Sequence, residues 1–567
     1  MYAMKKINII QILCCLIITL TNCTSLDFDE RDALDEKLVF TGYSSQRSFL
    51  YNIYGSLPRM DNYLHGGAML ANATDDSEFV NDFSSIQRFN TATVTKFFNP
   101  DDQWKNLYTG IRKCNTFLEK AVISTLDEYK SNNDPDRDGD QYYPELIKSL
   151  EYQRAEAKFL RSYFYFELIK RYGGVPIIID LSIDMESENF DIKRNSFDEC
   201  LNFIVKELNE IIPLLPIVHD DSDGLQSQTG RATKGAAMAL KSRLLLYAAS
   251  PLFNSSNNIT AWEQAARASF EVINSGLYTL EQNYKDLFLK SNSSELIFER
   301  RVADSNNFER ANYPIGYDGG NTGTCPSQNL VDAYEMQNTG LNIYEEGSGY
   351  DENDPYSNRD PRFYATINYN NANWSSRNIE IWHGGRDAPP IQNATKTGYY
   401  LRKYLNSDVR IGTGQNIIQR HTFYIFRLGE IYLNYVEAMN EAYGPDSDPE
   451  GFGLTAIEAI NIIRERADMP SLETGLTKEE LRRRLINERR VELSFENHRF
   501  WDVRRWKIAN DVLNQDLLGV TIEKVGDNQF VYTKKVVEQR LFVEKMYLYS
   551  IPYSETAKTT LEQNPGW

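Results

Sequence analysis

Residues 151–176, EYQRAEAKFLRSYFYFELIKRYGGVP, decide how the chain folds. Apolar and aromatic side chains recur there at spacings of three and four, which places a broad apolar face on one helix of about six turns. We expect the helix to end at Gly173 and Gly174, because glycine tolerates the left-handed backbone of a C-cap, and Pro176 prevents its continuation. A face this wide and aromatic needs other helices packed over it, which predicts several helical layers.

Composition and charge restrict the possible functions. The chain has 567 residues, of which 41% are hydrophobic, and a formal net charge of -19. This is enough apolar material for a globular protein with a large core. The acidic balance argues against nucleic acid as a partner, since a phosphate backbone needs clustered Lys and Arg. The 35 Tyr, 28 Phe and 7 Trp favour either thick helix packing or flat ring surfaces for a ligand.

The N-terminus resembles a bacterial lipoprotein signal. Two lysines precede an apolar run at residues 7–20, and a short polar stretch then leads to Cys23. We therefore expect residues 1–22 to be a signal peptide and Cys23 to carry the lipid anchor. A plain secretory signal and an N-terminal anchor are the alternatives, and translation could begin at Met1 or at Met4. The run is too short to span a bilayer, and no later stretch approaches the roughly 20 apolar residues that a span needs.

The cysteines that remain after the signal do not form a recognisable site. Cys114, Cys200 and Cys325 lie far apart in the sequence and include no CxxC pair. This spacing argues against a disulfide framework and against a zinc site. We expect all three to be small core residues.

Capping signals and apolar periodicity predict further helices. Ser196, Thr260 and Thr477 each begin a capping box, and Thr233 begins a helix rich in small residues. Helical patterns also cover residues 49–57, 104–122, 423–443 and 454–467. The predicted helices begin roughly 27 to 45 residues apart, near the period of about 34 residues of tetratricopeptide repeats, so we expect repeat-like helix pairs. Between residues 291 and 419 the periodicity fades and Gly, Asn, Asp, Ser, Tyr and Trp dominate, which predicts a loop-rich region.

Seven blocks in this sequence are similar to the RagB/SusD family. They are EAKFLRSYFYFELIKRYGGVP (156–176), ATKGAAMALKSRLLLYAA (232–249), FRLGEIYLNYVEAMNEA (426–442), AINIIRERADMP (459–470), NERRVELSFENHRFWDVRRW (487–506), YLYSIP (547–552) and NPGW (564–567). They follow the family's order and span nearly the whole mature chain. The resemblance implies an all-α, SusD-like fold with tetratricopeptide-like helix pairs on one side and an irregular, loop-rich ligand-binding part on the other.

The resemblance also implies a domain organisation and a function. Residues 23–567 would form one SusD-like domain, with an N-terminal part at 23–230 and a C-terminal part at 231–567 that contains the loop-rich residues 291–419. The function implied is that of a non-catalytic lipoprotein of the cell outer membrane, facing the exterior. It would bind a nutrient, usually an oligosaccharide or polysaccharide and in some relatives a peptide, and close as a lid on a SusC-type TonB-dependent transporter. No cofactor is required.

One acidic segment fits the spacing of a calcium loop. The pattern D-x-D-x-D-G-x5-E is formed by Asp134, Asp136, Asp138, Gly139 and Glu145. Carboxylates at alternate positions converge on a hard cation, glycine permits the sharp turn, and the final glutamate binds through both oxygens. The backbone carbonyl of Asp140 would supply one further ligand. An acidic, solvated connection between helices is the alternative, so the pattern predicts at most a structural calcium ion.

Candidate ligand-binding residues lie in the loop-rich region and near the N-terminus. Sugar faces stack on aromatic rings, and sugar hydroxyls bind polar side chains. The ring candidates, which we expect to be exposed among Asn, Ser and Gly, are Tyr313, Tyr317, Tyr350, Trp374 and Trp382. The polar candidates, in a segment that resembles one lining the binding face of the family, are Asp75, Asp76, Asn81 and Arg88.

The sequence offers little support for catalysis. Glu496, His498 and Asp502 could be mistaken for a metal site, but we expect a structural motif in which Arg499, Trp501 and Arg504 bridge helices. The sequence has no Gly-x-Ser-x-Gly elbow, phosphate loop or H-E-x-x-H motif. The sequence does not exclude a pair of carboxylates that hydrolyses glycosidic bonds, because 80 acidic residues always provide candidates. Two alternatives therefore remain, a secreted glycan-active hydrolase on a helical scaffold and a helical-repeat scaffold for protein interactions.

Overall fold

The computed structural model describes residues 39–59, 67–131, 139–181, 192–219, 230–290, 292–412 and 416–567. The chain divides into two compact units, one containing residues up to 49 together with 120–150, and the other containing residues 50–119 and 151–567. The parts expected from the resemblance follow the order of the sequence, whereas these units interleave along the chain.

The first unit is built around three helical segments. Within the described residues it contains parts of α3 (Tyr43–Tyr54) and α6 (Gly139–Tyr172) and the 3-10 helix η3 (Ile123–Ser131). The hydroxyl groups of Tyr43 and Ser149 share a hydrogen bond of 2.6 Å. The backbone N–H of Tyr43 donates to the hydroxyl of Tyr129 at 3.3 Å. Tyrosine hydrogen bonds therefore connect all three segments.

Helix α6 confirms the helix predicted from residues 151–172. It ends at Tyr172, and Gly173 has a φ of 75°, the left-handed conformation of a C-cap. A side chain on Gly174 would meet the backbone oxygen of Asn195 at 2.1 Å, so this position accepts only glycine. The helix begins earlier than the apolar stripe indicated, at Gly139, and contains Pro144.

The aromatic residues of α6 lie in the core of the second unit. Phe159, Tyr163 and Phe166 are buried. Phe159 packs edge to face on Phe298 with ring centroids 5.1 Å apart, and Phe166 packs in the same way on Tyr247 at 5.3 Å. These contacts with strand and helix residues far away in the sequence fix the position of α6 within this unit.

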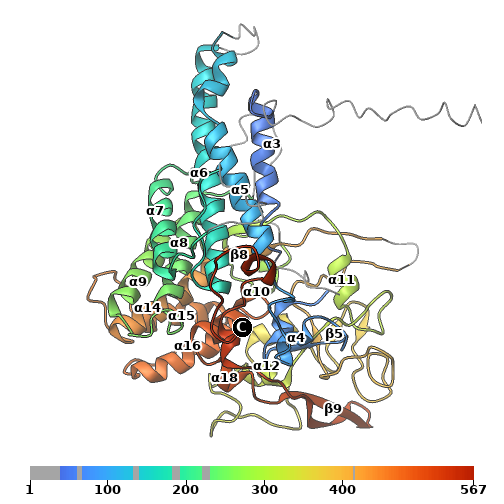
Figure 1. Ribbon diagram of the computed structural model, residues 1–567. Coiled ribbons are helices and arrows are strands. Elements are labelled where there is room, and N and C mark those ends of the chain that lie inside the picture. Colours follow the sequence, from blue (N-terminus) through green and yellow to red (C-terminus); the bar gives the residue numbers. More distant parts are fainter. Residues whose placement is uncertain are drawn as a thin grey trace, which may run out of the picture. The chain divides into compact units, whose positions relative to one another are not determined.

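The other long helices of the second unit pack side by side. They are α5 (Trp104–Lys120), α7 (Phe197–Ile211), α8 (Lys234–Ala249), α9 (Ile259–Asn274), α14 (Leu428–Tyr443), α15 (Ala456–Arg466), α16 (Lys478–Glu492) and α17 (His498–Arg505). Helix α8 packs on α7 and α9, and α14 packs on α8, α9, α15 and α16 (Figure 1). The buried alanines Ala236, Ala237 and Ala239 allow neighbouring helices to approach α8 closely. Consecutive, contacting helices of this kind agree with the expected repeat-like pairs.

The predicted helix caps are confirmed in three places and wrong in one. Ser196 and Thr477 form capping boxes at the starts of α7 and α16, and the Thr233 side chain caps α8. Helix α9 is capped by Asn258 rather than by Thr260, because the Asn258 side chain accepts the backbone N–H of Thr260 at 3.0 Å. An asparagine two residues upstream therefore outcompetes the predicted threonine.

Two predicted helices are interrupted. Residues 423–427 form the buried strand β8 (Phe423–Arg427), which pairs with β2 (Leu296–Arg300), so the helix predicted there starts only at Leu428. The aromatic and β-branched side chains of FYIFR favour a strand once a partner strand is available. The run after Thr477 breaks between α16 and α17, where Phe495 and Asn497 have left-handed φ values of 60° and 64°.

The loop-rich region is confirmed, with short elements that hold a second hydrophobic cluster. Between residues 292 and 412 no described helix exceeds six residues. The short elements of this side of the second unit are η2 (Leu70–Ala73), β1 (Ser77–Phe79), α4 (Gln87–Asn90), α10 (Tyr284–Leu287), α11 (Asn307–Asn312), β3 (Thr324–Pro326), α12 (Gln328–Ala333), α13 (Pro361–Thr366), β4 (Ile367–Asn368), β5 (Asn373–Trp374), β6 (Arg377–Asn378) and β7 (Tyr400–Leu401). Strand β1 pairs with β3, β4 with β7 and β5 with β6, all antiparallel.

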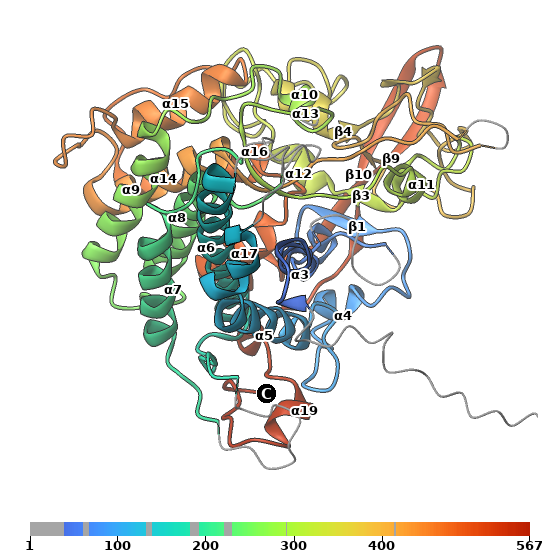
Figure 2. The same ribbon diagram turned by 90° about the horizontal axis from the view of Figure 1, so that it is seen from above.

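A long β-hairpin near the C-terminus was not predicted from the sequence. Strands β9 (Leu517–Gly526) and β10 (Gln529–Glu538) pair antiparallel, and Asn528 in their turn has a φ of 56°. The hairpin joins the loop-rich region, because the backbone N–H of His383 donates to the Ile522 carbonyl at 2.8 Å (Figure 2). Three short helical elements complete the chain, α18 (Ala509–Val512) before the hairpin and η4 (Glu544–Tyr547) and α19 (Tyr553–Thr556) after it.

The three cysteines of the mature chain are core residues, as predicted. Cys114, Cys200 and Cys325 are free and buried. Burial raises the pKa of the Cys200 thiol to about 11, so this group stays protonated at neutral pH. Within the described ranges, no helix is long and apolar enough to cross a membrane.

Candidate functional site

The block at residues 487–506 forms a buried ion network. Glu492 accepts hydrogen bonds from Arg362 at 2.9 Å and from Arg427 at 2.8 Å, and it also pairs with Arg466. All four side chains are buried. The three guanidinium groups outweigh the effect of burial and hold the pKa of Glu492 well below its ordinary value. This carboxylate is therefore a permanent, fully paired charge that joins α16 to β8, α13 and α15.

The acidic residues that resemble a metal site are neutralised by cations. Glu496 accepts from Lys403 and from Arg427, both at 2.7 Å, while Asp502 accepts from Arg489 and Arg505 at 2.8 Å. The nearby His498 is buried, and burial together with Arg243 and Arg489 lowers its pKa well below the ordinary value. These side chains serve the structure. Arg499 joins α17 to Asp75, which lies in the turn between η2 and β1, so it does not bridge two helices as predicted.

The polar candidates near the N-terminus do not form one site. Asp75 and Asp76 are 8% and 0% exposed. Asp75 accepts both nitrogens of the Arg499 fork at 2.9 Å, and Asp76 accepts from Arg490 at 2.7 Å. Burial alone would raise the pKa of Asp75, but Arg490 and Arg499 hold it below its usual range. Both buried carboxylates therefore pair with arginines, although Oδ2 of Asp76 makes no hydrogen bond within the described residues, and this corrects the expectation that they line a ligand site.

The two remaining N-terminal candidates are exposed but engaged locally. The Asn81 side chain accepts the backbone N–H of Phe83 at 3.0 Å. The Arg88 guanidinium lies over the Phe98 ring at 4.8 Å and donates to the Thr93 carbonyl at 3.3 Å. Their role in ligand binding stays a prediction.

The prediction of exposed rings is wrong for Trp374 and Tyr313. They are 3% and 4% exposed, and their rings meet edge to face at 5.8 Å. The β5–β6 turn directs Trp374 into the hydrophobic cluster of the loop-rich region, where the hydroxyl of Tyr317 donates to the Trp374 carbonyl at 2.9 Å. Arg377 covers the Tyr317 ring at 4.0 Å. Trp374 and Tyr313 therefore present no free face to a sugar, and the half-buried Tyr317 has one face covered by Arg377.

The other two ring candidates are half-buried. Tyr350 lies near the Arg359 guanidinium, 5.7 Å from its ring centroid. Trp382 lies against Phe530 of β10 with ring centroids 5.4 Å apart, and Lys524 approaches its ring at 5.0 Å. Of the five predicted rings, Trp382 is therefore the one that lies against the β9–β10 hairpin.

A groove of about 500 Å³ opens between residues 353–371 and the β9–β10 hairpin. Its lining residues are Asn353, Asp354, Tyr356, Ser357, Tyr369, Asn370, Asn371, Asn528, Gln529, Phe530 and Tyr532. Five of these side chains are amides and four are aromatic rings. Asp354 is the single charged side chain among them, and Lys, Arg and His do not occur in the lining.

The aromatic side chains form a continuous series along the groove. Trp382 adjoins Phe530, and the centroid of Phe530 lies 6.4 Å from that of Tyr532. Tyr532 meets Tyr356 edge to face at 5.3 Å, and Tyr356 lies 4.7 Å from Tyr369. Phe530, Tyr532 and Tyr369 are half-buried, so parts of their rings stay accessible to a ligand. Rings in series, with amides between them, match the alternation of apolar faces and hydroxyl groups along a sugar chain.

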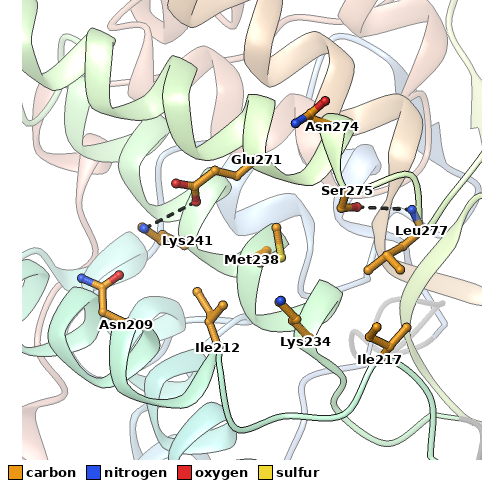
Figure 3. A pocket seen from close by; sticks show the side chains of 10 residues that line it. All are labelled: Asn209, Ile212, Ile217, Lys234, Met238, Lys241, Glu271, Asn274, Ser275 and Leu277. Carbon is orange, nitrogen blue, oxygen red and sulfur yellow. Dashed lines mark hydrogen bonds and ion pairs between the residues drawn. The ribbon is translucent and has the colours of Figure 1, made fainter. Parts of the chain in front are cut away.

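A second groove, on the helical side, lacks these features. It has a volume of about 550 Å³ and lies between α7, α8 and α9. Figure 3 shows Met238 and Ile212 in this groove beside the ion pair of Lys241 and Glu271, whose charged atoms are 3.7 Å apart. No aromatic residue belongs to its lining. The groove beside the hairpin is therefore the better candidate for sugar binding, although it is slightly smaller.

Most residues of this groove were not predicted from the sequence. Tyr369 and Asn370 belong to the stretch NYNNANW, in which only the tryptophan was a predicted ligand residue. Phe530 and Tyr532 were missed because the hairpin was not predicted. Two strand-like runs of ten residues separated by Asp527 and Asn528 are the signal that could have revealed it.

The predicted calcium loop and lipidation site lie mostly outside the described residues. Cys23, Asp134, Asp136 and Asp138 belong to undescribed ranges. The backbone of Asp140 and Glu145 is helical within α6. The calcium site therefore stays a prediction.

Comparisons with known proteins agree with this architecture. The SusD family model matches residues 290–567, and a family model described as starch-binding associating with outer membrane matches residues 35–246. A SusD-like protein of Formosa agariphila is 23% identical over 532 residues, 90% of this chain and 92% of its own length. A SusD-like protein of Bacteroides ovatus is 25% identical over 411 residues, 70% of this chain and 68% of its own length.

Solved structures share the fold. A SusD-like protein from Bacteroides fragilis superimposes with a TM-score of 0.75 and 28% identity, covering 93% of this chain and 98% of its own. A SusD-like carbohydrate binding protein from the same species has a TM-score of 0.73 and 24% identity, covering 92% and 99%. A laminarin binding SusD-like protein has a TM-score of 0.61 and 22% identity, with the same coverage. Matches in sequence and in fold thus extend over almost the whole chain, which belongs to the SusD family.

Proposed function

We propose that this protein is a lipid-anchored, glycan-binding protein of the outer-membrane surface that delivers an oligosaccharide or polysaccharide to a SusC-type TonB-dependent transporter. The observation that carries the proposal is the groove in which Tyr369, Phe530 and Tyr532 offer accessible rings beside five amides. The names of two structural neighbours, which describe carbohydrate and laminarin binding, support it. The order of basic, apolar and cysteine residues at the N-terminus supports the anchor at Cys23.

The chemistry of the groove supports binding without catalysis. Hydrolysis of a glycosidic bond ordinarily uses two carboxyl groups on either side of the bond. Asp354 is the single carboxylate among the lining residues. A glycan-active hydrolase, the alternative function, would need a second acid that this groove does not supply.

Affinity electrophoresis and reducing-end assays test the proposal together. Residues 24–567, without the lipid, are run in gels that contain laminarin, starch or other neutral and acidic polysaccharides, and retardation reports binding. We expect a variant with Tyr369, Phe530 and Tyr532 replaced by alanine to lose retardation. The matched control is Phe83→Ala, because Phe83 is an exposed ring outside the groove. New reducing ends that disappear in Asp354→Asn would instead establish a hydrolase.

Localisation and transport need separate tests. Replacing Cys23 by alanine should abolish incorporation of a labelled fatty acid and release the protein from the outer membrane. Co-purification of the wild-type protein with a SusC-type transporter encoded beside it would support the lid role. Retardation by peptides but by no glycan would redirect the proposal to a peptide nutrient.

We also propose that a calcium ion stabilises the segment from Asp134 to Glu145. The spacing of the carboxylates supports it. Calcium should then raise the melting temperature of the wild-type protein, and a variant with Asp134 and Glu145 replaced by alanine should not respond. A wild-type melting curve that is the same in calcium and in chelator would remove the site.

A further inference from the structure

One amide in the groove has an unpaired hydrogen-bond donor. Asn370 is 1% exposed and lines the groove. Its Oδ1 accepts the backbone N–H of Ile381 at 3.1 Å, whereas its Nδ2 makes no hydrogen bond within the described part of the chain. If the amide were flipped, its NH2 group would face the N–H of Ile381, and two donors would oppose each other. The orientation with Oδ1 toward Ile381 is therefore the one that chemistry allows.

The amides nearest to Asn370 are paired, and of the buried side-chain atoms without a hydrogen bond in the described part of the chain, only Asn370 Nδ2 belongs to the groove lining. Asn368, two residues earlier and also buried, donates from Nδ2 to the Leu401 carbonyl at 3.2 Å. In the groove itself, Nδ2 of Asn353 donates to Asp351 at 3.1 Å. A buried donor without an acceptor costs about 1 to 3 kcal/mol, and native proteins contain few of them. The unpaired Asn370 donor therefore carries a free-energy cost, which a hydrogen bond to a ligand oxygen would remove.

The surroundings of Asn370 place this donor among the rings of the groove. The Asn370 amide lies beside the Tyr532 hydroxyl, and donation from the amide partly offsets the effect of burial, which raises the pKa of Tyr532. The contact is not aligned well enough to satisfy Nδ2, which keeps its capacity to donate to a better-placed oxygen. Tyr369 precedes Asn370 in the chain and also lines the groove. A sugar that lies on these rings would bring its oxygens to the level of Nδ2.

The charges of the lining indicate which sugars suit this position. Asp354 repels an anionic sugar, and the lining contains no cationic side chain to attract one. Lys524 approaches Trp382 and Arg402 approaches Trp374, but neither cation belongs to the lining. A uronic acid or sulfated sugar would therefore lack a counter-charge in the groove.

We propose that Asn370 is a specificity-determining residue of the groove, which donates from Nδ2 to an acceptor oxygen of an uncharged saccharide. This inference rests on the proposed function. Binding gives the buried donor a hydrogen-bond acceptor. A saccharide with an oxygen at this position should therefore bind with higher affinity than a saccharide without it. Asn370 acts in recognition, and no chemical step is assigned to it.

This inference is tested in two steps. An array of neutral and acidic glycans first shows which saccharides the protein binds. Calorimetry then measures the affinity for the best-bound neutral oligosaccharide. The informative variant is Asn370→Asp, which keeps the acceptor for Ile381 and removes the donor. Asn353→Asp is the charge control, because it adds the same charge to the same groove at an exposed amide that is already paired. We expect Asn370→Asp to lose at least about tenfold in affinity at pH 7, and Asn353→Asp to lose less than about threefold.

A pH series separates recognition from a merely structural role. When the carboxyl group introduced by N370D is protonated at low pH, it can donate a hydrogen bond again. The affinity of N370D should therefore recover toward the wild-type value as the pH falls, while that of N353D should change little. Because protonation also removes the charge, Asn370→Ser, which removes the amide without adding charge, is measured beside N370D and should show the same loss of about tenfold. A loss confined to N370D would attribute the effect to charge.

The outcomes distinguish this inference from the proposed function. A wild-type protein that binds no glycan on the array contradicts both. Wild-type binding that survives in N370D overturns the role of Asn370 and leaves the function standing. Equal losses in N370D and N353D attribute the effect to charge and likewise overturn that role. Preferential binding of acidic glycans contradicts the inference that the saccharide is uncharged.

Discussion

In the buried network around α16, the carboxylate of Glu492 meets three guanidinium groups, whereas in the groove the Nδ2 of Asn370 meets no acceptor within the described part of the chain. Both groups are shielded from water. The first is fully paired within the chain, so removing it would leave buried guanidinium groups without their counter-charge. The second lines a groove, where a partner from outside the chain can pair with it. Nε of Arg466 is also buried without a hydrogen bond, so what distinguishes Asn370 is its position at the groove and not the missing partner alone.

The largest effect is expected from breaking the ion network. Glu492→Ala leaves Arg362, Arg427 and Arg466 buried with one fewer carboxylate, which should cost about 3 to 5 kcal/mol in the free energy of unfolding. Urea unfolding followed by circular dichroism measures this change. The control on the same helix is Glu479→Ala, whose side chain is 72% exposed and lies 3.7 Å from Arg482. A Glu492→Ala variant as stable as Glu479→Ala would contradict the structural role of the network.

The next test compares a buried ring with a ring of the groove. Trp374→Ala should lower the free energy of unfolding by about 3 to 5 kcal/mol, because it leaves a cavity in the hydrophobic cluster. Glycan affinity of the folded fraction should persist. Phe530→Ala should behave in the opposite way, with up to about a tenfold loss of affinity and a smaller loss of stability. The reverse pattern would restore Trp374 as the sugar platform.

A smaller, pH-dependent effect is expected at Asp75. Arg490 and Arg499 hold its pKa below the ordinary value in the folded state, so this carboxylate stabilises the protein above about pH 4 and loses that contribution as the pH falls. Asp75→Asn should therefore cost about 1.5 to 3 kcal/mol at pH 7. Thermal melts between pH 7 and pH 3 should show the difference from wild type shrinking with acidification. A difference that stays constant would exclude this linkage.

The smallest effect is expected at the end of the hairpin. Burial and a hydrogen bond with Glu78 raise the pKa of Glu538 to about 7. Because the folded state holds this proton more tightly than the unfolded state, stability should fall as the pH rises toward 7. Glu538→Gln should remove this dependence and melt slightly above wild type at pH 8. Glu523→Gln, an exposed change on the paired strand, should melt like wild type at every pH.

Local signals allowed much of the framework to be predicted. The apolar stripe and the glycine pair of α6, and the capping boxes at Ser196 and Thr477, depend on residues within a few positions of each other. The same blocks identified the SusD family. Where two local signals competed, as Asn258 and Thr260 did at the start of α9, the prediction failed.

The sequence by itself therefore determined most of the helices, several of their caps and the family, because spacing and capping act along the chain. Only the tertiary structure decided which rings and charges are available. Arg499, 424 positions away in the sequence, occupies Asp75, and Tyr313 buries Trp374. The groove likewise exists because a hairpin at residues 517–538 meets a loop near residue 370. Burial depends on what packs from elsewhere in the chain, and no local pattern contains that information.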